Sequence, residues 1–197
     1  MRKFQRVNQP DFLVDHWEAW GADWERRKSN NKSARFNWHK FEGKPVNELL
    51  LPPLKEQTQE HCSFCDSFPV SPPSDDTIEH FRPKSSFPRE AYRWENLYFC
   101  CRHCQQKFEE FDEALLRPDA DDYDFDQYFR WDFTQGTIEV NDHAPTEHQN
   151  RARVTIDLYR LNEGHPRWRR LAMRRRGQGR NDPLDDFPYR HYVEQPG

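Results

Sequence analysis

The sequence predicts an α+β fold that is mostly helical and has a short two-stranded hairpin near its centre. Residues 11–28 carry apolar side chains at three- and four-residue steps, which is the period of an amphipathic helix. The segments 77–81 and 97–99 have the short length and apolar character of strands. Two Cys-x-x-Cys pairs, at 62–65 and 101–104, bracket these strands, so one metal ion can join the two ends of the hairpin.

The N-terminal part is predicted to be helical on either side of an irregular segment. The apolar stripe of the first helix consists of Leu13, Trp17, Trp20 and Trp24. Residues 29–45 are polar and are predicted to be irregular. A second helix is predicted to start at Pro52–Pro53, because proline is tolerated in a first turn, and to run to about Glu60.

The middle of the chain contains the predicted hairpin. Residues 66–76 are rich in proline and serine, which predicts a loop. The strand at 77–81 is expected to pair with 97–99, which leads into the second cysteine pair. A helix is predicted over 102–116 and is ended by Pro118.

The C-terminal part is predicted to begin with a second hairpin, over residues 128–140, with a Thr-Gln-Gly turn. Residues 146–161 are predicted to be helical, and a last helix is predicted to open at Pro166. That helix is expected to bury an apolar stripe and to expose its arginines. The stripe consists of Trp168, Leu171 and Ala172. Residues 181–197 are predicted to form a loose tail.

The composition limits the class of function. The chain has 197 residues, of which 34% are hydrophobic and 32% are charged, which is lean for a large core. Its net charge of −4 excludes a protein that binds nucleic acid through its overall charge. Residues 109–126 hold nine acidic side chains, and residues 167–180 hold seven arginines. The acidic segment is expected to be solvated or to face a partner. The arginine segment can grip nucleic acid, dock on an acidic protein or form a solvated helix, and charge alone does not choose.

The two cysteine pairs predict a structural zinc site. Four thiolates from two Cys-x-x-Cys pairs complete one tetrahedral zinc site, and the ligands are Cys62, Cys65, Cys101 and Cys104. Cys100 is left over and is expected to be a small buried apolar residue. A site in which His103 replaces one thiolate is an alternative with less economical spacing. The zinc is expected to carry part of the folding free energy of this lean chain.

The predicted organisation has three segments. Residues 1–60 are an N-terminal helical segment, 61–118 are the zinc-clamped core, and 119–197 are a C-terminal extension with a hairpin and a basic helix. The odd number of five cysteines, four with metal spacing, favours a reducing compartment over a disulfide scaffold. No apolar run has the length of a signal peptide or a membrane span, so the expected location is the cytoplasm, without a membrane partner.

The motifs between and after the cysteine pairs resemble those of the HNH endonucleases. The chain reads IEHFRPKS at 78–85, WENL at 94–97 and CRHC at 101–104. The flanking segments, MRKF at the start and TIDLYRLNEG with RWRRLAMRRR near the end, resemble the PtuB-like HNH proteins of Septu-type and some retron-type antiphage defence systems. This resemblance implies a ββα-metal hairpin, nuclease activity, DNA as the expected substrate and an ATPase (PtuA-like) partner.

The resemblance also gives roles to three residues of the hairpin. His80 would be the general base that takes a proton from the attacking water. Asn96 would either orient His80 or hold the hairpin loop. Glu79 would ligate a catalytic Mg²⁺ or Mn²⁺, for which a carboxylate is a suitable hard ligand. In a regular strand Glu79 and His80 point to opposite faces, so a twist or bulge is needed for both to reach one phosphate.

Further candidate residues surround this trio. Gln105 occupies the third motif position, where the family usually has Asn or His, so its role as a ligand departs from the pattern. Glu109 would add a carboxylate to the same helix face as Gln105. Arg82, Lys84 and Lys107 would contact nucleic-acid phosphates. The alternative to an enzyme is a catalytically silent zinc adaptor that binds nucleic acid or the partner protein.

Overall fold

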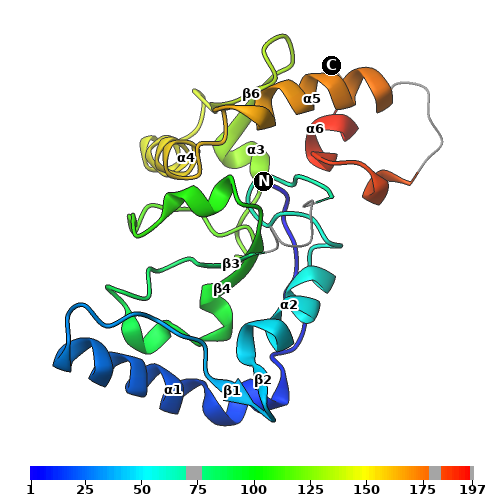
Figure 1. Cartoon of the computed structure of the whole chain (residues 1–197). Coiled ribbons are helices and arrows are strands. Elements are labelled where there is room, and N and C mark those ends of the chain that lie inside the picture. Colours follow the sequence, from blue (N-terminus) through cyan, green and yellow to red (C-terminus); the bar gives the residue numbers. More distant parts are fainter. Residues whose placement is uncertain (70–76, 178–182, 196–197) are drawn as a thin grey trace.

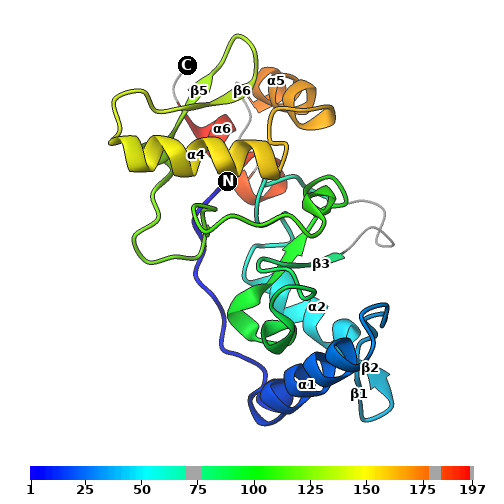
Figure 2. The same ribbon diagram turned by 90° about the vertical axis from the view of Figure 1, so that its left-hand side faces the viewer.

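The computed structural model describes residues 1–69, 77–177 and 183–195. In these ranges the fold is α+β, with six α-helices and three antiparallel sheets of two strands each (Figure 1). The helix α1 and the strands β1 and β2 lie at one end of the molecule, and α4, α5, α6 and β6 lie at the other (Figures 1 and 2). The strands β3 and β4 lie between these ends. Within the same ranges, none of the helices combines the length and the apolar character needed to cross a membrane.

The first predicted helix is confirmed as α1, Asp11–Asn30. It buries Leu13 and Trp24 from its apolar stripe. Gly21 lies in the middle of this helix, where glycine costs stability. The structure gives a reason, because a Cβ atom there would clash with the backbone carbonyl of Arg89.

The segment predicted to be irregular contains two very short strands, β1 at Lys40–Phe41 and β2 at Lys44–Pro45. They lead into α2, Val46–Glu56, so the prediction of a helix starting at Pro52–Pro53 is wrong in its boundaries. Both prolines lie inside the helix. The buried side chains of α2 recur at four-residue steps and pack it against the central hairpin. This packing offsets the hydrogen bonds that the prolines remove.

The central hairpin is confirmed. The strand β3, Thr77–His80, pairs antiparallel with β4, Leu97–Cys100, and His80 lies opposite Leu97. Side chains on its two faces enter two different apolar clusters. The N-terminal cluster contains Leu13, Trp24, Val46, Leu50, Leu54, Ile78, Leu97 and Phe99. The C-terminal cluster contains Phe64, Phe81, Tyr98, Leu116, Tyr128, Phe129 and Tyr159. The hairpin therefore joins the two ends of the molecule through its own buried residues.

The helix predicted over 102–116 is absent. Only one short 3₁₀ turn, η4 at Cys104–Lys107, follows the second cysteine pair. It ends where Phe108 adopts φ +52°, a left-handed conformation that cannot continue a right-handed helix. The loop predicted over 66–76 carries no helix or strand at 66–69, and the rest of it lies outside the described residues.

The second hairpin is confirmed with its turn. After the short helix α3, Phe125–Tyr128, the strand β5, Phe129–Asp132, pairs with β6, Thr137–Val140. Gly136 takes φ +68° in the turn. The predicted helix that follows is also confirmed as α4, Thr146–Leu158.

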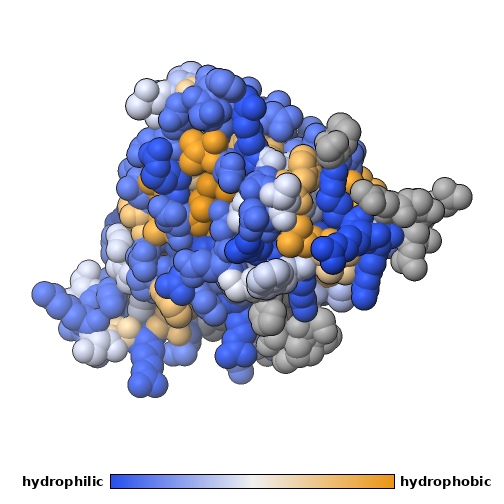
Figure 3. Space-filling model, turned by 90° about the horizontal axis from the view of Figure 1, so that it is seen from above, coloured by the Kyte–Doolittle hydropathy of each residue, from blue (hydrophilic) through white to orange (hydrophobic). Residues whose placement is uncertain are grey.

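The last predicted helix is confirmed as α5, His165–Gly177, but its buried face differs from the prediction. Trp168 is 65% exposed, Ala172 is exposed, and the fully buried side chain is Arg170. The surface seen from this end of the molecule is mostly hydrophilic, with separate apolar patches (Figure 3).

The burial of Arg170 follows from what α5 packs against. Its guanidinium donates to the carbonyl oxygens of Gly136 at 3.1 Å and Leu161 at 2.7 Å, and it lies over the ring of Trp131. Loop carbonyls and an aromatic face can accept a planar cation, whereas an aliphatic side chain would leave these carbonyls unpaired.

The tail predicted over 181–197 is ordered in its described part, residues 183–195. It forms a 3₁₀ turn, η5 at Leu184–Asp186, and a short helix, α6 at Arg190–Glu194. The buried guanidinium of Arg190 pairs with Asp66, with Nη2 2.7 Å from Oδ1. The tail is therefore docked on the turn that follows the first cysteine pair.

Candidate functional site

Four cysteines form a cluster at the base of the central hairpin. The Sγ atoms of Cys62, Cys65, Cys101 and Cys104 all lie within 4.8 Å of one another, and those of Cys65 and Cys101 are 3.6 Å apart. Thiolates bonded to zinc at about 2.3 Å in a tetrahedron are about 3.8 Å apart. The donor type, the number of donors and their spacing therefore fit a structural zinc ion, and the cluster could hold one.

The two remaining candidates for this cluster have other partners. Cys100 lies in β4 outside the cluster, and it is fully buried beside the hydroxyl of Thr77. Nε2 of His103 is 2.9 Å from the carbonyl oxygen of Arg160. The four-thiolate set needs neither of them.

His80 ends β3 in an aromatic surrounding. Its ring stacks on Trp38 with centroids 5.4 Å apart, and it meets the edge of Phe36 at 5.5 Å. Nε2 is 3.0 Å from the carbonyl oxygen of Ala91, which can only accept, so Nε2 carries the proton and Nδ1 has the lone pair. Burial, together with the positive charge of Lys84, lowers the pKa of His80 to about 3. The ring is therefore neutral at pH 7.

Glu79 is buried beside a lysine. Its Oε1 atom lies 3.0 Å from Nζ of Lys107, without a hydrogen bond of normal geometry, and it has no other hydrogen-bond partner among the described residues. Burial raises the pKa of Glu79 to about 7, and the ammonium of Lys107 opposes that rise. A buried carboxylate oxygen that is ion-paired but not hydrogen-bonded could also serve as a hard ligand for a divalent ion.

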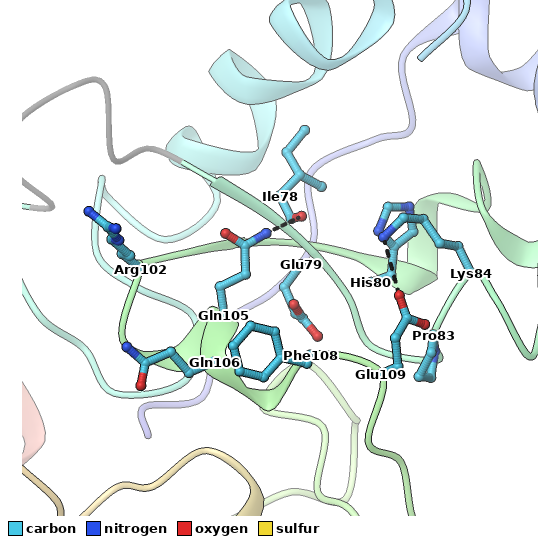
Figure 4. A pocket seen from close by; sticks show the side chains of 10 residues that line it. All are labelled: Ile78, Glu79, His80, Pro83, Lys84, Arg102, Gln105, Gln106, Phe108 and Glu109. Carbon is cyan, nitrogen blue, oxygen red and sulfur yellow. Dashed lines mark hydrogen bonds and ion pairs between the residues drawn. The ribbon is translucent and has the colours of Figure 1, made fainter. Parts of the chain in front are cut away.

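Glu79 and His80 line the same cavity, although they are consecutive in a strand. The cavity has a volume of about 460 Å³ and lies between β3 and the η4 turn (Figure 4). β3 has a partner strand on one side only, so side chains from both of its faces reach a cavity along its other side. The remaining lining residues are Ile78, Pro83, Lys84, Arg102, Gln105, Gln106, Phe108 and Glu109.

Gln105 and Glu109 reach this cavity by a different route from the one expected. Gln105 lies in η4 and donates from Nε2 to the carbonyl oxygen of Ile78 at 3.4 Å. Glu109 does not share a helix face with it, because η4 ends at Lys107. Glu109 nevertheless lines the cavity, where its carboxylate is partly exposed and contacts Ser85 and Lys84.

Asn96 holds the loop that follows β3 and makes no hydrogen bond with His80. Its Oδ1 atom accepts from the backbone N–H of Arg82 at 2.7 Å, and its Nδ2 atom donates to the carbonyls of Arg82 and Glu90, each at 3.0 Å. Of the two roles considered for Asn96, the geometry fits the holding of the loop.

The three basic residues expected to contact phosphates lie in different places. Lys84 lines the cavity, with Nζ 3.8 Å from Glu109. Arg82 is bound by the carboxylates of Glu90 at 3.1 Å and Glu113 at 3.0 Å and does not line the cavity. The side chain of Lys107 is 0% exposed and is paired with Glu79. It is therefore not available as a surface contact for nucleic acid.

Sequence reasoning missed the aromatic surround of His80 and two residues at the rim of the cavity. Phe36 and Trp38, which contact His80, come from the segment that was expected to be irregular. The close spacing of aromatic residues in this segment was the one signal that could have indicated a buried role. Arg102 and Phe108 line the cavity and flank Gln105, but neither belongs to the motif.

The acidic segment does not form one solvated surface. Asp119 is buried between Arg6 and Arg117, and Tyr98 donates to it at 2.6 Å. Four of its other aspartates are exposed, namely Asp121, Asp122, Asp124 and Asp126. In the basic segment Arg180 lies outside the described residues, and the exposed arginines of α5 are Arg169, Arg175 and Arg176.

A scan of the chain against protein-family models gives no match, and a search of curated proteins gives none either.

Proposed function

We propose that this chain is a metal-dependent endonuclease with an HNH-type ββα-metal hairpin. The enzyme would hydrolyse phosphodiester bonds of nucleic acid, and DNA is the expected substrate. One observation carries the proposal. A neutral histidine, His80, and a buried carboxylate, Glu79, line one cavity of about 460 Å³. The four-cysteine cluster that could hold zinc includes Cys101 and Cys104. The residues that follow them in the chain, Arg102 and Gln105, line this cavity. This combination supports hydrolysis more directly than a purely structural role.

His80 would act as the general base. Its Nε2–H is held by the carbonyl of Ala91, so the lone pair of Nδ1 is the one that can take a proton from water. A ring with a pKa of about 3 is a weak base in the free protein. The negative charge of a bound phosphodiester would raise its proton affinity, because an anion nearby favours the imidazolium form.

Glu79, Gln105 and Glu109 are the residues that would hold a catalytic Mg²⁺ or Mn²⁺. They offer oxygen donors around one cavity, and Oε1 of Glu79 has no hydrogen bond among the described residues. Such an ion, when bound, supplies positive charge that stabilises the phosphoryl oxygens and the leaving oxygen. Lys84 would add a further positive charge toward the phosphate.

The silent zinc adaptor remains the second candidate, because one observation favours it. Lys107 already neutralises Glu79, and Gln105 offers a neutral amide in place of an anionic or imidazole ligand. A cavity with so little uncompensated negative charge holds a divalent ion less firmly than a cavity with two free carboxylates.

We propose further that the protein acts in the cytoplasm as the nuclease of an antiphage defence system, together with an ATPase partner. The support is the resemblance of the motifs and flanking segments to PtuB-like proteins. Co-purification of the chain with a candidate ATPase tests the partnership, and absence of a complex at micromolar concentrations of both proteins would count against it.

Cleavage of plasmid DNA in Mg²⁺ or Mn²⁺ tests the nuclease itself. Wild type is compared with His80→Ala and with His143→Ala, which changes an exposed histidine far along the sequence. Zinc content and melting temperature are measured for all three, because His80 is packed among aromatic rings. Cutting by wild type and His143→Ala, but not by a folded, zinc-loaded His80→Ala, is the expected result. Equal cutting by His80→Ala would contradict the role of His80. If wild type cuts only when the ATPase is added, the same comparison is made in the complex.

A further inference from the structure

Phe108 is an exposed aromatic ring at the rim of the candidate active-site cavity. It is 67% exposed, and it belongs to neither of the two apolar clusters of the described residues. Its ring lies in front of the cavity, between the side chains of Gln106 and Glu109 (Figure 4). The folding of the protein therefore gains little from this side chain.

The backbone that presents Phe108 is itself unfavourable. Its φ of +52° is a left-handed conformation, which a bulky residue adopts at a cost. The turn is closed by the backbone N–H of Phe108, which donates to the carbonyl of Gln105 at 3.1 Å. Single exposed apolar residues are common on protein surfaces. Here a conformation that costs energy places an aromatic ring at the mouth of the cavity, where the ring can contact a ligand with a flat apolar face.

Two cations near Phe108 provide partners for an anionic part of this ligand. Two cations, Lys84 and Arg102, line the same cavity, together with the carboxylates of Glu79 and Glu109. Glu79 is paired with the buried Lys107, and Glu109 lies 3.8 Å from Lys84. Arg102 is exposed and has no hydrogen-bond or ion-pair partner among the described residues. A flat ring beside two cations is the arrangement with which proteins bind single-stranded nucleic acid, in which the ring stacks on a base and the cations contact the backbone.

We propose that Phe108 stacks on a nucleobase next to the phosphate that enters the cavity. In a continuous duplex both faces of each base are covered by its neighbours, so this contact requires a base that is unpaired or turned out of the stack. The substrate class is therefore single-stranded or locally opened nucleic acid rather than an intact duplex. This inference rests on the proposed function of the same cavity.

Binding measurements with Phe108 variants test the proposal. Fluorescence anisotropy is recorded for a labelled single-stranded oligonucleotide and for its duplex, in buffer without added divalent ions, so that cleavage does not interfere. Phe108→Ala and Phe108→Leu are expected to weaken single-strand binding about tenfold, Phe108→Trp to retain it, and all three to leave duplex binding within about twofold. The Phe108→Leu variant keeps an apolar side chain but removes the flat ring, so it distinguishes stacking from apolar contact. Val14→Ala, which truncates another exposed apolar residue, is the control and should change neither.

An abasic nucleotide locates the contact. The abasic nucleotide is placed at each position of the oligonucleotide in turn. At one position it should weaken binding by the wild type, and at that same position it should not weaken binding by Phe108→Ala any further. Unchanged binding by Phe108→Ala, equal losses at every abasic position, or no binding of either oligonucleotide by wild type would each overturn the proposal. The two proposals can fail separately. Loss of cleavage in His80→Ala with no effect of Phe108→Ala leaves the nuclease without this subsite, and Phe108-dependent binding without cleavage leaves the subsite without the nuclease.

Discussion

Replacing Asn96 with alanine should loosen the loop that follows β3. The side chain of Asn96 is 3% exposed and makes three hydrogen bonds, one to the N–H of Arg82, one to its carbonyl and one to the carbonyl of Glu90. The loop between these two residues leads to Ala91, whose carbonyl holds the ring of His80. Asn96 is therefore a positioning residue, which acts on His80 through the loop.

The size of the effect follows from these three bonds. A neutral hydrogen bond contributes about 1 kcal/mol net, and a buried partner left without one costs more. The expected loss for Asn96→Ala is about 3 kcal/mol in the free energy of unfolding. With a urea m-value of about 2 kcal/mol per molar, the unfolding midpoint should fall by about 1.5 M.

Urea unfolding followed by tryptophan fluorescence measures this loss, and trypsin tests its location. Lys84 and Arg89 are the cleavage sites within the loop, and both should be cut faster in the folded variant. Asn150→Ala, which truncates an exposed asparagine of α4, is the matched control and should stay within about 0.5 kcal/mol of wild type. A loss below about 1 kcal/mol for Asn96→Ala, or unchanged cutting of the loop, would refute the reasoning.

Three further predictions concern the metal cluster, the pH dependence and the docked tail. Cys62→Ala should lose its zinc and at least about 5 kcal/mol of stability, whereas Cys100→Ala should keep the zinc, as metal analysis and thermal melting will show. Burial lowers the pKa of His191 to about 4, below its ordinary 6.5, so the unfolded chain takes up this proton first as the pH falls. The contribution of His191 to stability should therefore fall by up to about 3 kcal/mol between pH 6.5 and 4, so urea titrations of His191→Gln should show a drop that is smaller than the wild-type drop by this amount. Arg190→Met should cost about 3–5 kcal/mol in the same assay, because Asp66 is left buried without its cation.

The sequence pattern was sufficient where local signals and the fold agree. The short apolar segments 77–81 and 97–99 predicted the hairpin, and the spacing of the cysteine pairs predicted the thiolate cluster. The period of α1 was visible because its apolar positions face the N-terminal cluster. In each of these cases neighbouring residues carry the information.

The pattern failed where distant partners decide the conformation. Pro52 lies inside α2 because the apolar face of that helix packs on β4. Arg170 is buried because the carbonyl of Gly136, in the turn of the second hairpin 34 residues away, and the carbonyl of Leu161 accept its hydrogen bonds. Phe108 ends the turn after the second cysteine pair, and no periodicity signals a left-handed residue there. Glu79 and His80 share a cavity because β3 has a partner strand on one side only, which the sequence of one strand does not reveal.

The docking of the tail on the first cysteine turn has a consequence for the timing of synthesis. Asp66 and Arg190 are separated by 124 residues, and the backbone N–H of Tyr189 also donates to the carbonyl of Asp66. The fourth thiolate, Cys104, leaves the ribosome about 90 residues before Arg190, which at about 5–20 residues per second is about 5 to 20 s. A zinc ion could therefore enter the thiolate cluster while this side of the turn is still exposed to solvent, and it would be harder to remove once the tail has docked.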